Sequence, residues 1–531
     1  MSQAAKEIIF EEQARQKLYS GLKQLANVVA STLGPKGRNV GLEKSWGAPI
    51  ITNDGSSIVR DVEVKDPFEN MGISIAKEMV QKMKDKCGDG TTTTVLMLRA
   101  LVESGLKYIS SGASPIGLKR GMEKALDATL QSLEKMAIPI KNSKEIKNVA
   151  TVSASSSEEI GNFITEAIEK VGKSGVITIE EAKGTETTLE IVEGMQFDRG
   201  YMSAYFCTNS EKMNVEMKHP ALLLVDKKIS SIHDLLPILQ TVATTGRELL
   251  IIADDLDSDT LSTLVVNKLR GTLKVTAVKA PGFGDKKKAI LEDIAILTGA
   301  TVICEETGTT LKEATSEMLG EADKIVVTKE NTMIVSTKGD KKRIQARLNQ
   351  IEAEIKATTS SYDKEKLEER RAKLSGGVAL IRVGAATEPE LKNRKQAFED
   401  SLNSTKAALE DGIVSGGGVA LLRASKAIDS LKLEADELLG AKIVQQACEV
   451  SCRQIALNAG FDGSVILGQV LKAPATHGFN ALTDKVEDLI QAGVIDPAKV
   501  VKHTLLFATS AASIILLSEA LIADAEEDKA A

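Results

Sequence analysis

GDGTTTTVLMLRALVESGL, residues 88–106, joins a loop of glycine and threonine directly to a segment with helical periodicity. Glycines let backbone N–H groups approach a phosphate, threonine hydroxyls add donors, and a helix N-terminus favours negative charge. Asp89 in this loop is an oxygen ligand of the kind that Mg²⁺ prefers. The same residues also suit a simple capped helix start, because threonine and aspartate are good capping residues. The loop is a candidate phosphate site that needs support from elsewhere in the chain.

Three further segments have the residues that a nucleotide pocket without a P-loop requires. They are a bend after a helix at 32–37, a carboxylate at a strand end at 53–55, and the glycine triplet 416–418 before a helix. Each alone is an ordinary turn or cap. The chain has no GxxxxGK[ST], HExxH or GxSxG signature and no Rossmann glycine triplet after a strand. Any phosphate chemistry must therefore use another geometry.

The composition indicates a multi-domain globular protein. At 531 residues the chain exceeds the length that one hydrophobic core usually spans, so we expect two to four domains. Hydrophobic residues make up 43% and aromatic residues only 3%, so the cores must consist mainly of alanine, valine, isoleucine and leucine. The formal net charge of -7 argues against a general nucleic-acid binder, because phosphate binding needs an electropositive face.

Targeting and redox features favour a cytoplasmic location. Residues 1–10 include Lys6 and Glu7 and do not resemble a cleavable signal, and no run of 18 or more uninterrupted apolar residues occurs. The five cysteines are an odd number without a CxxC pair, which suits a reducing compartment. Cys448 and Cys452 lie four residues apart, so they either share a ligand or are buried free thiols, and we expect the second.

Both ends of the chain have helical periodicity. Helices are expected over 11–32 and 91–106, and a short hairpin around Ser45-Trp46-Gly47 joins strands within 40–52. Residues 412–523 are again mainly helical, and the polar, unpatterned residues 523–531 predict a frayed tail. The two ends are therefore expected to share one helical domain.

The middle of the chain alternates strands and helices. Strands are expected at 175–180, 221–225, 249–253, 274–278 and 324–328. A charge-dense helical hairpin is expected over 340–374, flanking a sheet rather than binding a partner. This pattern predicts an α/β unit inserted into the helical domain.

Five strings resemble group I chaperonins, the GroEL family. They are TLGPKGRNV (32–40), DGSSIVRDVEVKDPFENMG (54–72), GDGTTT (88–93), VKAPGFGDKKKAILEDIAILTG (278–299) and ALEDGIVSGGGVAL (408–421). The resemblance extends over nearly the whole chain. It implies a multi-domain GroEL-like chaperonin fold with a mainly α-helical equatorial ATP-binding domain (1–135 and 411–531), a small α+β intermediate hinge domain (136–192 and 378–410) and an inserted α/β apical domain that binds clients and co-chaperonin (193–377).

The resemblance also implies a nucleotide site made of residues from several parts of the chain. Asp54 and Asp400 would be catalytic, with Asp400 positioning the attacking water, and Asp54 and Asp89 would hold Mg²⁺ beside the phosphates of ATP. Gly417, Asn480 and Asp496 would contact the base and ribose. The full set of residues implied around the nucleotide is Thr32, Leu33, Gly34, Pro35, Asp89, Gly90, Thr91, Thr92, Thr93, Gly417, Asn480, Ala481 and Asp496. From the residues alone Asp400 would pass as a solvated helix residue, because it lies off the apolar stripe of its helix.

A second site is implied in the apical domain, where residues match those that grip unfolded chains and the co-chaperonin. They are Tyr201, Tyr205, Phe206, Leu236, Leu239, Leu261, Val265 and Val266. Independently, residues 259–270 have an apolar arc wider than one buried face needs, which favours a partly exposed binding patch. The alternative is deep burial of this arc between a sheet and a neighbouring helix.

For partners, the resemblance implies homo-oligomeric seven-membered rings, normally stacked in pairs, a GroES-like co-chaperonin lid and unfolded or misfolded client proteins. It implies no nucleic-acid or membrane partner. Its cofactors are ATP and Mg²⁺, with K⁺ as a further candidate. The implied activity is ATP hydrolysis that drives encapsulation and folding of clients.

Some positions depart from the family pattern. Asn53 stands where the family usually has lysine, and Ser157 and Ala397 replace an acidic and a basic residue that often pair within the subunit. Arg199 and Glu388, which match a pair between neighbouring subunits, are both present, whereas C-terminal Gly-Gly-Met repeats are missing. These departures leave open a paralogue that acts as a holdase or assembly partner with a weakened ATPase. A small-molecule kinase is a third alternative, but we find no enclosed substrate site with its own base.

Overall fold

The chain folds into two compact units. The computed structural model describes residues 5–43, 49–154, 157–172, 175–182, 184–210, 213–304, 310–336, 340–358, 360–375 and 377–524. Unit 1 is Met1–Glu166, Glu181–Glu186 and Val383–Ala531, and unit 2 is Ala167–Glu180 and Thr187–Arg382. Unit 1 therefore contains segments from both ends of the chain, with most of unit 2 inserted between them. The division of the chain into equatorial, intermediate and apical domains stays a prediction.

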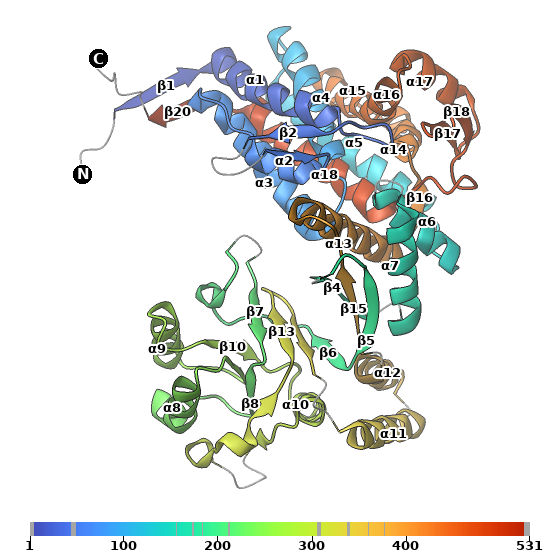
Figure 1. Ribbon diagram of the computed structural model, residues 1–531. Coiled ribbons are helices and arrows are strands. Elements are labelled where there is room, and N and C mark those ends of the chain that lie inside the picture. The colour runs from blue at the N-terminus through green and yellow to red at the C-terminus, as the bar shows by residue number, and fades with distance from the viewer. Residues whose placement is uncertain are drawn as a thin grey trace. The chain divides into compact units, whose positions relative to one another are not determined.

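Unit 1 is built around long packed helices (Figure 1). Its helices are α1 (Glu11–Ala30), α2 (Gly55–Asp61), α3 (Pro67–Cys87), α4 (Thr91–Ser110), α5 (Pro115–Met136), α6 (Ser143–Ser153), α13 (Glu388–Asp411), α14 (Val419–Ala424), α15 (Ala435–Ala447), α16 (Val450–Asn458), α17 (Gly463–Lys472) and α18 (Ala498–Leu517), and α7 (Glu158–Val171) runs on into unit 2. The main core is formed by apolar residues of α1, α3, α4, α5, α15 and α18. In α4, Leu98, Leu101 and Val102 are fully buried, which confirms the apolar face expected from the periodicity.

Helix α18 is long and apolar enough to cross a membrane, and it is the one helix of the described part of the chain with this property. Its side chains Leu505, Ala508, Ala512 and Ile515 are completely buried in the main core of unit 1. A helix that is apolar on most sides is expected where it is surrounded by other helices. Helix α18 is therefore placed as a central core helix of unit 1.

The two ends of the described chain pair with each other. Strands β1 (Lys6–Phe10) and β20 (Ala520–Asp524) run antiparallel, with Ile8 opposite Ile522, as Figure 1 shows near the labelled termini. The expectation of a frayed tail is therefore wrong for residues 523 and 524, because ladder hydrogen bonds order their backbone. The rest of that predicted tail, 525–531, lies outside the described residues.

Three other strand pairs belong to unit 1. They are β2 (Val40–Leu42) with β3 (Ile50–Thr52), β16 (Ile413–Ser415) with β19 (Ile495–Pro497), and β17 (His477–Asn480) with β18 (Lys485–Asp488), all antiparallel. The first pair confirms the hairpin expected within 40–52, although its predicted turn at Ser45-Trp46-Gly47 lies outside the described residues. Strands β3, β16 and β19 carry or adjoin predicted site residues, so these short pairs position the site.

Unit 2 contains three sheets and the helices that cover them. The parallel sheet has the order β10 (Val275–Lys279), β9 (Leu249–Ala253), β8 (Ala221–Val225), β11 (Val302–Ile303), with β12 (Gly320–Glu321) antiparallel to β8. The second has the order β6 (Gly194–Phe197), β14 (Thr332–Val335), β13 (Lys324–Val327), β7 (Val215–Lys218), and the third has the order β4 (Val176–Glu181), β15 (Val378–Val383), β5 (Thr188–Val192). All five strands predicted for this part of the chain are confirmed to within one residue.

The helices of unit 2 are α8 (Leu236–Thr245), α9 (Ser258–Leu269), α10 (Asp285–Thr298), α11 (Lys341–Ala357) and α12 (Ser361–Ser375). The predicted hairpin over 340–374 is confirmed as α11 and α12. Asp293 of α10, which is fully buried, accepts hydrogen bonds from Arg347 Nε and Arg370 Nη2, both at 2.8 Å. These charge-assisted bonds fasten the hairpin to α10, which supports its expected role beside a sheet.

Cys448 and Cys452 are buried free thiols, as expected from the sequence. Burial raises the pKa of Cys448 to about 12 and the pKa of Cys452 to about 11, so neither is a reactive thiolate. Within the described residues, no group of three or more histidine, cysteine, aspartate or glutamate side chains is arranged to hold a metal ion.

Candidate functional site

Four aspartates from separate segments of unit 1 are linked by electrostatic interactions, in which Asp89 interacts with each of the other three. Asp54 precedes α2, Asp89 precedes α4, Asp400 lies in α13 and Asp496 lies in β19. Burial raises the pKa of Asp400 well above its ordinary value, and the charges of Asp54 and Asp89 add to this shift. Burial and the charge of Asp89 raise the pKa of Asp496 to about 7. Such effects require charges close to one another, so we treat these four residues as one carboxylate cluster.

Asp54 is fixed at the N-terminus of α2. Its carboxylate accepts hydrogen bonds from the backbone N–H groups of Ser56 (3.1 Å) and Ser57 (2.9 Å) and from their hydroxyls at 2.8 and 2.6 Å. Burial opposes ionisation, but the hydrogen bonds from Ser57 and Ser56 and the charge of Lys84 hold the pKa of Asp54 below its ordinary value. Asp54 is therefore an ionised carboxylate held in one orientation by the helix that it caps.

The loop 88–90 presents Asp89 between two glycines in the left-handed conformation. Gly90 has φ 80°, and a Cβ there would also lie only 2.7 Å from Val500 Cγ1, so glycine is required. The Asp89 carboxylate accepts a hydrogen bond from the Gly90 N–H at 2.5 Å and others from Ser153 and Ser404. Burial raises the pKa of Asp89, although these hydrogen bonds oppose the shift. The loop thus holds a half-buried carboxylate at the start of α4.

The turn around Asp54 and the threonine run of α4 are in direct contact. A Cβ on Gly55 would lie 2.1 Å from Thr92 Oγ1 and 3.3 Å from Thr91 Oγ1, so only glycine permits this approach. Thr91 is buried, and Thr92 and Thr93 are half-buried. The structure therefore brings together two motifs that are distant in the sequence, since Gly55 and Asp89 are 34 positions apart.

Asp400 enters the carboxylate cluster from α13. Its Oδ1 accepts a hydrogen bond from Gln396 Nε2 at 2.6 Å, one turn earlier in the helix. The positive charge of Lys84 opposes, but does not cancel, the increase in the pKa of Asp400 that burial and Asp54 cause. A carboxylate with a raised pKa is a stronger base than an ordinary one, which suits activation of a water molecule. This environment is not that of a solvated helix residue.

The glycine triplet 416–418 lies beside Asp496. Strand β16 pairs with β19 so that Val414 is opposite Asp496, and a Cβ on Gly416 would lie 3.2 Å from Asp496 Oδ1. A Cβ on Gly417 would lie 3.6 Å from the carbonyl oxygen of Phe479, the residue before Asn480. The triplet therefore contacts both of the segments that the resemblance assigns to the base and ribose.

Asn480 is held at both ends of its amide group. Nδ2 donates to Glu487 Oε1 at 2.7 Å, and Oδ1 accepts from the Leu482 N–H at 3.0 Å. Asn480 and Ala481 are buried. The orientation of this amide is therefore fixed by the β17–β18 hairpin itself.

The segment 32–35 follows α1 and contacts α16. Asn458 Nδ2 donates to the carbonyl oxygens of Ala30 and Leu33, both at 2.8 Å. Helix α16 also contacts the glycine triplet, because a Cβ on Gly418 would lie 2.7 Å from the backbone nitrogen of Cys452. Helix α16 therefore links this segment to the triplet. Exposure rises along the segment, from buried Thr32 through half-buried Leu33 to exposed Gly34 and Pro35.

Sequence reasoning missed several residues of this site. They are Lys84, Ser153, Gln396, Ser404 and Glu487. Gln396 precedes Asp400 by one helical turn, a spacing that was visible in the sequence. Ser153 and Ser404 come from α6 and α13 and hydrogen-bond each other at 2.6 Å, so only the packing of the two helices reveals their role.

The carboxylate cluster fits a magnesium ion that binds together with a nucleotide. Mg²⁺ takes few protein ligands and completes its shell with phosphate oxygens and water, so Asp54 and Asp89 are sufficient. Burial and nearby negative charge raise the pKa values of Asp89 and Asp400. A bound cation would relieve this repulsion, so the donor set has the chemistry that such an ion requires.

The second predicted site lies in unit 2 and is only partly exposed. Tyr205 is 67% exposed, Val266 42% and Leu236 39%, whereas Tyr201, Leu261 and Val265 are half-buried. Leu269, in the same apolar arc of α9, is 62% exposed, which confirms that this arc is wider than the buried face of the helix. We call the exposed residues Tyr205, Leu236, Val266 and Leu269 the apolar surface. Phe206 and Leu239 are buried, so they lie in the core of unit 2 and do not form the surface itself.

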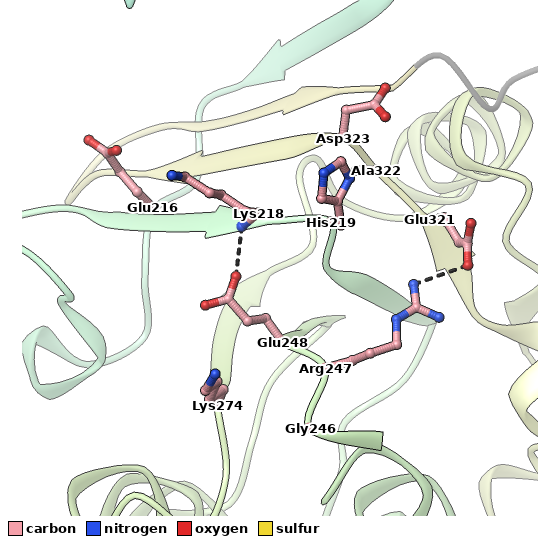
Figure 2. Close-up of a pocket in the computed structure, with 10 residues that line it drawn as sticks. All are labelled: Glu216, Lys218, His219, Gly246, Arg247, Glu248, Lys274, Glu321, Ala322 and Asp323. Carbon is pink, nitrogen blue, oxygen red and sulfur yellow. Dashed lines mark hydrogen bonds and ion pairs between the residues drawn. The ribbon is translucent and has the colours of Figure 1, made fainter. Parts of the chain in front are cut away.

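A pocket of 730 Å³ in unit 2 contains none of the predicted site residues (Figure 2). It lies where β7, β9 and β12 begin or end, and charged side chains of both signs line it. Arg247 pairs with Glu321 at 3.1 Å, and the Lys218 N–H donates to Glu248 at 2.6 Å, as the dashed lines of Figure 2 show. Because none of the residues predicted to bind the nucleotide lines this pocket, we do not treat it as the nucleotide site.

Comparison with known proteins gives one consistent result. The TCP-1/cpn60 chaperonin family matches residues 25–526. The chain is 68% identical over 524 residues to a protein named Chaperonin GroEL 3 from Protochlamydia amoebophila (strain UWE25), covering 99% of this chain and 98% of the relative.

Among solved structures, the chain resembles the chaperonin gp146 from the bacteriophage EL 2 (Pseudomonas aeruginosa), crystallised in the presence of ATP-BeFx. The TM-score is 0.68 at 22% sequence identity, and the match covers 97% of this chain and 98% of the other. At this identity the likeness concerns the fold, and it agrees with the helical unit and inserted α/β unit described above.

Proposed function

The chain belongs to the TCP-1/cpn60 chaperonin family, and from that premise we propose how its residues drive protein folding with ATP. It is a GroEL-type chaperonin, an ATPase that folds other proteins with a co-chaperonin. The observation that carries the proposed mechanism is the convergence of Asp54, Asp89 and Asp400 beside the glycine and threonine donors of α4.

The phosphates of ATP bind at the start of α4. The helix N-terminus and the hydroxyls of Thr91, Thr92 and Thr93 supply donors to phosphate oxygens, and Gly90 lets the backbone come close. Asp54 and Asp89 hold Mg²⁺, which when bound neutralises phosphate charge. Gly417, Asn480 and Asp496 surround the base and ribose, and Thr32 to Pro35 line the nucleotide. The fixed amide of Asn480 supports a specific contact with the base.

Asp400 orients the attacking water and takes its proton. Its raised pKa makes it a stronger base than an ordinary carboxylate, and the bond from Gln396 Nε2 fixes one of its oxygens. The other oxygen is directed to the water. This role needs a short proton transfer within a site partly shielded from bulk water, and half-buried Asp400 meets that need.

In unit 2, the apolar surface holds unfolded clients and the co-chaperonin in turn. Exposed Tyr205, Leu236 and Val266 give a non-polar surface that many unfolded chains can contact without a defined sequence. Half-buried Tyr201, Leu261 and Val265 widen it, and buried Phe206 and Leu239 support it from below. ATP binding and hydrolysis in unit 1 release the client from this surface, which then binds the co-chaperonin.

The working assembly is a homo-oligomer of seven-membered rings, two of them stacked, capped by a GroES-like lid, in the cytoplasm. Within this chain Glu388 pairs with Lys392 at 2.7 Å and Arg199 lies over the ring of Phe283, so the pairing of Arg199 with Glu388 of a neighbouring subunit stays a prediction. The requirement for K⁺ also stays a prediction.

A holdase or assembly partner with a weakened ATPase is the second candidate, and exposed Asn53 in place of a lysine favours it. The presence of Asp54, Asp89 and Asp400 in one cluster favours the active enzyme. A steady-state ATPase assay on the assembled protein separates the two, because a holdase would protect clients without turnover.

The test of the proposed function is refolding of an aggregation-prone client by the assembled protein. We expect recovery of native client only when ATP, Mg²⁺ and a co-chaperonin are all present. Omitting either ATP or the co-chaperonin should leave the client bound and inactive. Equal recovery without ATP would contradict the proposal.

A further inference from the structure

One lysine enters the carboxylate cluster, although no sequence pattern pointed to it. Lys84 lies in the last turn of α3, four residues before Gly88. Its Nζ donates to Ser56 Oγ at 3.1 Å, and that hydroxyl in turn donates to Asp54 Oδ2 at 2.8 Å. The ammonium group is therefore joined through one hydroxyl to the carboxylate that caps α2.

The charge of Lys84 acts on two acidic residues that the proposed mechanism uses. It favours the ionised forms of both Asp54 and Asp400, whereas Asp54 and Asp89 act in the opposite sense on Asp400. Neighbouring lysines of α3 differ. Lys82, two residues earlier, is 61% exposed and pairs with Glu78 at 2.7 Å on the outside of the helix. Lys84 therefore has an environment that Lys82 does not share.

A site lined by Asp54, Asp89 and Asp400 would repel a polyphosphate unless cations balance the charge. One magnesium ion carries two positive charges, whereas the triphosphate and the three carboxylates, when ionised, together carry more than two negative charges. Sites for phosphoryl transfer generally add a lysine or arginine that contacts phosphate oxygens. Asn53, next to Asp54, is uncharged and exposed, so it does not supply this charge. The flexible four-carbon chain of Lys84 allows its ammonium group to move from Ser56 to a nearby anion.

We propose that Lys84 is a phosphate-binding residue of this chain, released from Ser56 to contact the β- or γ-phosphate oxygens when Mg-ATP binds. The proposal rests on the proposed function, because it requires the nucleotide phosphates to lie beside Asp54. It adds a residue and a role that the family resemblance did not assign. Its distinguishing consequence is that the contribution of Lys84 depends on the phosphates and not on the adenosine.

The first experiment measures equilibrium binding of ATP and AMP, each with Mg²⁺, to the assembled protein and its variants by calorimetry. Lys84→Gln should weaken ATP binding about 10- to 100-fold, since bonds between charged groups contribute about that much. AMP binding should change less than about threefold. Lys84→Arg should recover most of the ATP affinity, and the matched control Lys82→Gln should bind both ligands like the unchanged protein.

A second measurement does not require any variant to fold. The unchanged protein is treated with acetic anhydride in the presence of Mg-ATP or Mg-AMP, and acetylation of each lysine is followed by mass spectrometry. ATP should slow the acetylation of Lys84 several-fold more than AMP does, while Lys82 reacts equally in both.

Two results would overturn the inference. One is an ATP affinity that Lys84→Gln leaves unchanged or lowers by the same factor as the AMP affinity, which would make Lys84 a structural residue. The other is equal acetylation of Lys84 with ATP and AMP. Neither result touches the proposed function, which is tested separately by ATP hydrolysis and client refolding with the unchanged protein.

Discussion

The carboxylate cluster of unit 1 and the apolar surface of unit 2 depart from ordinary folding rules in opposite directions. The cluster places like charges near one another in half-buried positions, so that the pKa values of Asp89, Asp400 and Asp496 all rise. The apolar surface leaves Tyr205 and Val266 exposed to water, although burying these side chains would stabilise the folded protein. Natural proteins tolerate such local costs mainly at functional sites.

The two regions also differ in how tightly their geometry is fixed. Around Asp54 and Asp89, the approaches at Gly55 and Gly90 leave no room for a Cβ, so the backbone that carries these two aspartates is tightly packed. On α9, Val266 and Leu269 project into solvent from a helix that Leu264 anchors in the core. A site for one small ligand needs the first kind of construction, and a surface for many unfolded chains suits the second.

The largest stability effect expected from this comparison separates two neighbours on α9. Leu264 is fully buried and Val266 is 42% exposed. Leu264→Ala should lower the free energy of unfolding of unit 2 by about 2–5 kcal/mol, because it leaves a cavity in the core. Val266→Ser should change it by less than about 0.5 kcal/mol but weaken capture of an unfolded client. Chemical unfolding and a light-scattering assay of client aggregation measure the two effects.

The pair also tests whether the exposed residues serve binding rather than packing. If Val266→Ser destabilised the protein as much as Leu264→Ala did, the apolar surface would be part of the core. If client capture by Val266→Ser were unchanged while stability was retained, this residue would be removed from the client-binding set.

A smaller effect is expected from the half-buried carboxyl group of Asp496. Its pKa is about 7 in the folded protein, above the value near 3.9 of an unfolded aspartate. The folded state therefore binds the extra proton, and the stability that this contributes is lost as the pH rises from about 4 through 7. Asp496→Asn removes the group, so the variant should gain at most about 4 kcal/mol relative to the unchanged protein at pH 8 and little at pH 4.

Unfolding curves of both proteins between pH 4 and pH 8 measure this difference. A constant difference across that range would show that Asp496 does not titrate with a raised pKa. Asp496→Asn should at the same time weaken nucleotide binding if the residue contacts the ribose.

Much of unit 2 was predictable from local pattern. The runs of β8 and β9 are apolar throughout and every residue in them is buried, because parallel strands are covered on both faces. The terminal pair β1–β20 was not predictable. Each strand is short and mostly exposed, and each depends on a partner at the other end of the chain.

The site shows the same division between local and distant information. Asp54 and Asp89 lie in turns, and the glycine, serine and threonine residues next to them in the sequence indicate those turns. Asp400 lies off the apolar stripe of α13, so only the family resemblance suggested it. Ser153 and Ser404 meet through packing of α6 against α13, and no segment of the sequence by itself records that contact.

The central claim is that a carboxylate from α13 acts in ATP hydrolysis at a site built by α2 and α4. The most direct measurement compares ATP binding and steady-state hydrolysis by the unchanged protein, Asp400→Ala and the neighbouring control Glu399→Ala. We expect Asp400→Ala to bind ATP within about threefold of the unchanged affinity but to hydrolyse it at least about 100-fold more slowly, with Glu399→Ala close to normal. Hydrolysis by Asp400→Ala at the unchanged rate would contradict the account.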